Sequence, residues 1–234
     1  MNSLKRHKHA VLLVALIWVA LVQSFSHREV LGPVLSDLTI AMVMLVIFLI
    51  VFHRRVNRLV ASIAVVTAVV ADAAHYALPG FAELPLRLIY HSAAFLLVGF
   101  AALVMLRNIF EQHVVRIDDV LGAVCGYLLA AAAWSNLFML IEIFLPESFS
   151  VGPGFGAQLD TWHGRIAVMH YVSLGSLTSI GSGAIVPVRP PATILTTLEA
   201  VFGQFYIAVV VAQLVSARLS RLSQQNGSPQ AERL

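Results

Sequence analysis

Six long apolar segments, separated by short polar connections, limit what this chain can fold into more than any other feature. A helix of about 20 apolar residues crosses the hydrocarbon core of a bilayer. It also satisfies its backbone hydrogen bonds internally, which the bilayer interior requires. We therefore predict an all-α membrane protein whose six spans are residues 10–25, 34–52, 59–78, 86–106, 120–145 and 192–217.

The composition agrees with this class of protein. Of the 234 residues, 59% are hydrophobic and 12% are charged, whereas ordinary soluble domains carry about 25% charged residues. The single cysteine, Cys125, excludes an intramolecular disulfide framework, and we expect it to pack within its apolar segment. No block of like charge exceeds the basic run at residues 5–8, so we expect membrane lipid and no nucleic acid among the partners.

Basic residues predict how the chain is oriented. The basic run before the first segment also suits a signal peptide, but residues 22–26 lack an A-x-A cleavage site, so we interpret the segment as an uncleaved anchor. With the N-terminus in the cytoplasm, eleven of the 15 Lys and Arg residues lie inside. This asymmetry follows the positive-inside rule and predicts a multi-pass protein of the cell membrane with both termini cytoplasmic. The four basic residues left outside are Arg28, Arg87, Arg165 and Arg189.

Residues 170–187 combine a short apolar run with alternating glycines, in the order H-Y-V-S-L-G-S-L-T-S-I-G-S-G-A-I-V-P. Because glycine adopts positive φ without a Cβ clash, Gly181 and Gly183 would let successive carbonyl groups point to one side. A row of carbonyl oxygens replaces the water around a cation. A short helix over residues 164–177 would direct its negative dipole end at the same ion.

This stretch resembles the pore helix and selectivity filter of tetrameric potassium channels, usually written T-T-V-G-Y-G-D. The I-V-P at residues 185–187 and the run at 198–215 resemble the exit and inner helix of bacterial members. The resemblance covers residues 117–221. It implies six transmembrane helices, one re-entrant pore helix with its filter, and four subunits around one pore that conducts K⁺ passively.

The resemblance also implies roles for individual residues. Tyr171 and Glu199 would support the filter, and Gly203 is either a gating hinge or a site of close helix packing. The ion-coordinating filter would be Thr178, Ser179, Ile180, Gly181, Ser182 and Gly183, with K⁺ on the carbonyls of the first five. Ser179, Ser182 and Ala184 replace the family's second Thr, Tyr and Asp, which leaves the selectivity for K⁺ over Na⁺ open.

The first four spans lack the pattern of a voltage sensor, since Arg87 and Arg107 flank the fourth span with no basic residue between them. Asp72 and His75 on the third span and His91 on the fourth lie at similar depth in an antiparallel hairpin. A charged Asp is unfavourable inside a membrane and needs a partner. These three residues therefore predict a hydrogen-bonded clip, a proton-sensing switch or a divalent-metal site.

The sequence is compatible with more than one function. A nonselective monovalent cation channel, or a non-conducting sensor or scaffold that keeps the pore fold, fits the same residues. No H-E-x-x-H motif or phosphate-binding loop is present, so we expect no enzyme and no cofactor besides permeant ions. The predicted domains are a cytoplasmic N-terminus (1–9), a four-helix membrane domain (10–106), a cytoplasmic linker (107–119), the pore domain (120–221) and a disordered cytoplasmic tail (222–234).

Overall fold

The computed structural model describes residues 8–25, 31–52, 55–77, 83–111, 117–152 and 161–227. Seven helices and two short strands make up this part of the chain, which is almost entirely helical, as the sequence predicted. Along the chain they are α2 Lys8–Phe25, α3 Leu31–Val51, α4 Arg55–Ala77, α5 Glu83–Glu111, α6 Ile117–Phe144, β1 Phe149–Val151, α8 Trp162–Leu177, β2 Ile185–Pro187 and α9 Pro190–Gly227.

Five of these helices are long and apolar enough to cross a membrane, by length and composition: α3, α4, α5, α6 and α9. They correspond to five of the six predicted spans. The remaining predicted span corresponds to α2, whose apolar part, Lys8–Gln23, is shorter. Large apolar side chains such as Leu38, Leu49 and Leu96 are more than 60% exposed, which suits helices that face lipid.

Most helix ends lie within four residues of the sequence-based boundaries, but two helices extend further. Helix α5 continues to Glu111, beyond the predicted end at residue 106, and an Arg107–Glu111 ion pair of 2.6 Å supports its last turn. Since α6 begins at Ile117, residues 107–111 and 117–119 of the predicted linker are helical, and residues 112–116 lie outside the described residues. Helix α9 runs to Gly227, into the predicted disordered tail, because no proline interrupts it before Pro229.

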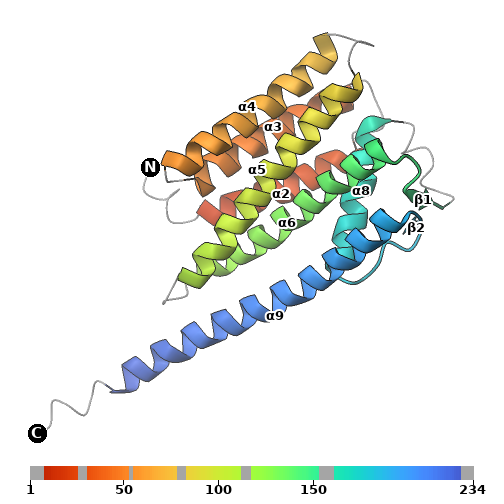
Figure 1. The fold of residues 1–234 in the computed structure, drawn as a ribbon. Helices are drawn as coiled ribbons and strands as arrows, with labels where there is room; N and C mark the ends of the chain where they lie inside the picture. The colour runs from red at the N-terminus through yellow and green to blue at the C-terminus, as the bar shows by residue number, and fades with distance from the viewer. Residues whose placement is uncertain are drawn as a thin grey trace, which may run out of the picture.

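The long helices pack around α5, which contacts both α4 and α6 (Figure 1). Leu97 of α5 and Leu129 of α6 are fully buried in the largest apolar cluster. Helix α2 lies against α3 and α6 and contributes Leu12 to this cluster. The first four helices are thus joined to α6 through an apolar core.

Helix α8 crosses the long helices at a steep angle and lies between α6 and α9 (Figure 1). The two strands pair antiparallel beside it, with Ser150 opposite Val186. This ribbon ties the segment after α8 to the segment after α6. As a result, residues 178–184 are held between the carboxyl end of α8 and the start of α9.

Candidate functional site

Helix α8 is defined at both ends by threonine caps. The Thr161 side chain accepts a hydrogen bond from the Gly164 N–H at 3.1 Å, which is the usual N-cap contact. At the other end, Thr178 donates from its backbone N–H (3.0 Å) and its hydroxyl (2.6 Å) to Leu174 O. The helix therefore ends at Leu177, and its negative dipole end faces the loop that follows.

The loop alternates in backbone conformation. Ser179, Gly181 and Gly183 have φ of 59°, 82° and 55°, while Ile180 and Ser182 between them are not in the positive-φ region. The two glycines adopt this region freely, but Ser179 is a non-glycine residue there, which is uncommon. The alternation predicted from the glycines thus extends one step further back, to Ser179.

Hydrogen bonds to α8 set the direction of two peptide groups in this loop. Ser179 N–H donates to Ser176 O and Gly181 N–H donates to Gly175 O, both at 2.9 Å. In a trans peptide the C=O points opposite to the N–H, so the carbonyls of Thr178 and Ile180 point away from α8. Among the described residues, none donates a hydrogen bond to the carbonyls of residues 178–181.

A glycine on α8 makes this arrangement possible. A Cβ at Gly175 would lie 3.0 Å from the backbone C and O of Gly181, so a side chain there would push the loop away from the helix. Gly175 is not among the site residues predicted from the sequence. Its position within an apolar helical run, where glycine is unfavourable, was the available signal.

The side chains of the loop face different surroundings. Ile180 is 84% exposed in the single chain. The Ser182 hydroxyl donates to Ile185 O at 2.6 Å, so it bonds to the residues that follow it rather than to α8. Tyr171 lies on the exposed side of α8.

Two other elements contact the carboxyl end of α8. The Tyr127 hydroxyl of α6 donates to Leu177 O at 2.8 Å. On α9, Gly203 lies so close that a Cβ there would collide with Leu177 O and would be 2.8 Å from Leu177 C. The contact at Gly203 is therefore a close backbone approach between α9 and α8.

Glu199 lies on α9 behind α8 and is fully buried. It is hydrogen-bonded to the Ser173 hydroxyl, which also lies 2.7 Å from Ala131 O. Since a hydroxyl has a single hydrogen, both contacts are hydrogen bonds only when Glu199 is protonated and donates to Ser173. In that form Glu199 joins α9 to α8 and, through Ser173, to α6.

Gln204 connects α9 to the loop itself. Its Nε2 donates to Ser179 Oγ at 2.9 Å, at the residue with the uncommon positive φ. Gln204 and Tyr127 were absent from the predicted filter supports. Polar residues in apolar helices were the signal, but their partners depend on how the helices are rotated against each other.

In the described part of the structure, Asp72 and His91 are not hydrogen-bonded to each other. His91 Nδ1 lies 2.8 Å from Asn136 Oδ1 of α6, and His91 is buried. Asp72 lines a small cavity of about 30 Å³ together with Asp37 and His163. His75 lies in the last turn of α4, and its side chain is outside the described residues.

The small cavity joins three of the first four helices to the start of α8. Asp37 of α3 forms an ion pair of 2.9 Å with His163 Nε2 of α8. Arg87 of α5 lies over the Trp162 ring, 3.7 Å from its centroid, and is paired with Glu83. Such cation–π and ionic contacts position α8 at its amino end.

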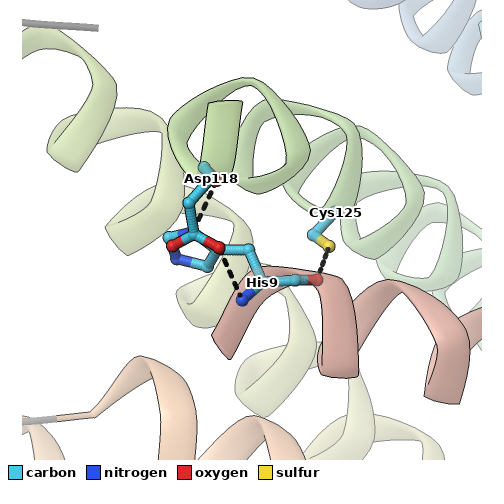
Figure 2. Close-up of polar contacts among 3 residues, drawn as sticks. All are labelled: His9, Asp118 and Cys125. Atoms are coloured by element: carbon cyan, nitrogen blue, oxygen red, sulfur yellow. Dashed lines mark hydrogen bonds and ion pairs between the residues drawn. The ribbon is translucent and has the colours of Figure 1, made fainter. Parts of the chain in front are cut away.

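A third polar connection anchors the start of the chain (Figure 2). His9 Nδ1 at the start of α2 lies 2.9 Å from Asp118 Oδ2 and 2.7 Å from Asp118 O in the first turn of α6. The Cys125 thiol donates to His9 O at 3.4 Å. Gly122 leaves room for the His9 ring, because a Cβ there would be 3.1 Å from His9 Nδ1.

No known protein family, curated protein or solved structure matches this chain. Among the described residues, no group of three or more His, Cys, Asp or Glu side chains could hold a metal ion.

Proposed function

We propose that this protein is a passive transmembrane cation channel, most simply a potassium channel, with ions coordinated by backbone carbonyls of residues 178–182. The observation that supports this most directly is the loop after α8. Its N–H groups at Ser179 and Gly181 bond back to the helix, and no described residue donates to the carbonyls of 178–181, whereas the Ser182 carbonyl accepts the Ile185 N–H at 3.3 Å. A desolvated cation would supply the partner that carbonyls need in a membrane.

The proposed channel is a homotetramer with six spans in each subunit, α2 included. One chain offers one column of carbonyls, and a cation needs such oxygens on several sides, so the site is complete only when copies surround an axis. Ile180 at 84% exposure and Phe205 of α9 at 66% exposure would be covered by neighbouring subunits. The excess of basic residues predicted for one side supports a cell-membrane protein with cytoplasmic termini.

A nonselective monovalent cation channel is the second candidate, and Ser182 favours it. Its hydroxyl bonds to Ile185 O within the same loop. Nothing in that contact braces the outer part of the loop against α8, so the spacing of its carbonyls can vary more. A looser ring of oxygens discriminates less by ion size.

Flux of K⁺ and of Na⁺ into proteoliposomes containing the purified full-length chain tests the proposal. Gly181→Ala is the informative variant, because φ is 82° there and a Cβ would meet nothing within 4 Å. It perturbs the backbone conformation and not the packing. Gly99→Ala is the matched control, since its Cβ would lie at an ordinary 3.7 Å from Ala133.

We expect K⁺ flux in the unmodified chain and in Gly99→Ala, and its loss in Gly181→Ala. The ratio of K⁺ to Na⁺ flux separates the two candidates. Absence of flux for both ions, or undiminished flux through Gly181→Ala, would refute the assignment of residues 178–182 as the ion pathway.

A further inference from the structure

A second, larger cavity lies between the first helices and α8. Its volume is about 350 Å³, and residues of α2, α3, α5, α6 and α8 line it. An engineered apolar cavity of about 150 Å³ binds benzene, and natural small-molecule sites start at about 300 Å³. The walls are mostly apolar, and the polar residues among them are Gln23, Tyr90, His91, Asn136 and His170.

The hydrogen-bond network assigns a single role to each nitrogen of His91. Asn136 Nδ2 donates to Ala132 O at 2.8 Å, which fixes the amide so that its Oδ1 faces His91 Nδ1 at 2.8 Å. An amide oxygen only accepts, so Nδ1 carries the hydrogen of the neutral imidazole. Nε2 is then a hydrogen-bond acceptor.

That acceptor has no donor in the described part of the chain. His91 is 1% exposed, and its Nε2 is buried without a hydrogen-bond partner. A buried polar atom without a partner is unfavourable, and it lies on a residue that lines a cavity large enough for a small molecule. A ligand with a hydroxyl group would supply the missing donor.

The mouth of the cavity indicates the route of entry. Ile17 and Leu21, both on α2, line the cavity and are about half exposed. Both side chains lie on an apolar helix of a membrane protein. An apolar molecule dissolved in the bilayer therefore reaches the cavity along α2.

We propose that this cavity binds a small uncharged amphiphile, an apolar molecule with one hydroxyl group that donates a hydrogen bond to His91. Binding itself does not depend on ion conduction. Only its effect on flux rests on the proposed function.

The cavity lies beside α8, the helix that precedes the candidate filter. Ile166, His170 and Leu174 of α8 line it. Leu174 O accepts both hydrogen bonds from Thr178, at 3.0 and 2.6 Å, that set the start of the loop. A bound molecule therefore contacts the helix that positions the carbonyls, and occupancy changes cation flux.

The test uses an octanol that carries a photoactivatable diazirine, with the full-length chain in liposomes and the labelled residues identified by mass spectrometry. We expect labelling on α2, α5, α6 and α8 around the cavity that excess 1-octanol prevents. Octane, which has no hydroxyl, should compete about tenfold less well, as expected for one lost hydrogen bond.

Two variants and a control make the outcome decisive. His91→Leu removes the acceptor, and Val98→Phe fills the cavity while keeping His91; both should abolish the competed labelling. Val66→Phe, on the exposed face of α4 and outside this cavity, should label normally. Labelling that persists in Val98→Phe, or that octane prevents as well as octanol, overturns the proposal, whereas labelling as predicted without ion flux would contradict only the channel function.

Discussion

Both halves of the molecule have an apolar core, but they differ in the polar contacts that are added to it. In the amino-terminal half, helices α2 to α5, apolar packing dominates, with residues such as Ile47 and Leu97 in its core. In the carboxyl-terminal half, α6, α8 and α9 with the two strands, polar side chains converge on one helix end and one loop. Tyr127 donates to Leu177 O of α8, and Glu199 is hydrogen-bonded to Ser173 of α8. Gln204 donates to Ser179 in the loop that follows.

This difference shows that the carboxyl-terminal half depends more closely on exact atomic positions. Apolar packing defines which helices are neighbours but tolerates small shifts and substitutions of similar volume. Hydrogen bonds depend on distance and angle, so they fix the loop within narrow limits. Polar contacts also connect the halves, among them those of His9 with Asp118, Asp37 with His163, and His91 with Asn136.

The largest expected effect of substitution lies in the carboxyl-terminal half, at Gly203. We expect Gly203→Ala to destabilise the folded protein by about 3 kcal/mol, because its Cβ collides with Leu177 O. Unfolding in detergent measures this. Gly99→Ala should change stability by about 1 kcal/mol or less. A stable Gly203→Ala with altered flux would instead favour the hinge interpretation of this glycine.

The next largest effect is expected at Glu199, which is a buried polar residue in an apolar helix. Glu199→Leu should cost about 2 kcal/mol, because it removes the hydrogen bond to Ser173. Glu199→Gln keeps a donor for Ser173 and should cost less than about 1 kcal/mol. Unfolding midpoints of both variants in the same detergent are the measurement. Equal losses in both would mean that a charged carboxylate is required.

Tyr127→Phe removes one hydrogen bond to the end of α8 without changing the packing of the ring. The expected loss of stability is about 1 kcal/mol, because Leu177 O loses its donor. Flux should fall as well if the loop coordinates ions. Tyr206→Phe, which removes a comparable hydrogen bond to Ala123 O away from the loop, is the matched control, and an equal loss of flux in the two variants would contradict a special role for Tyr127.

The smallest effect is expected where the halves meet, at the partly exposed pair Asp37 and His163. A double-mutant cycle with Asp37→Asn and His163→Gln should give a coupling energy of about 0.5 kcal/mol. Unfolding of the unmodified chain, the two single variants and the double variant supplies the four corners of the cycle. A coupling energy above the loss of stability measured for Tyr127→Phe would place this contact between the halves above the one within the carboxyl-terminal half.

Much of the fold could be predicted from local features of the sequence. Apolar runs predicted the five helices of spanning length, and the glycines at 181 and 183 predicted positive φ in the loop. The partners of polar residues could not be predicted in this way. His91 was expected beside Asp72, yet its described partner is Asn136, because a helix rotation of one residue, about 100°, redirects a side chain entirely.

The sequence by itself determined that this chain forms apolar helices and a loop with alternating backbone conformations, because hydropathy and glycine act through neighbouring residues. Only the tertiary structure decided which groups meet. Gly175 admits the loop against α8, Gly203 admits α9, and Tyr127 and Gln204 hold the helix end and the loop. These contacts join residues far apart in the chain, so they depend on how whole helices pack, which no local pattern specifies.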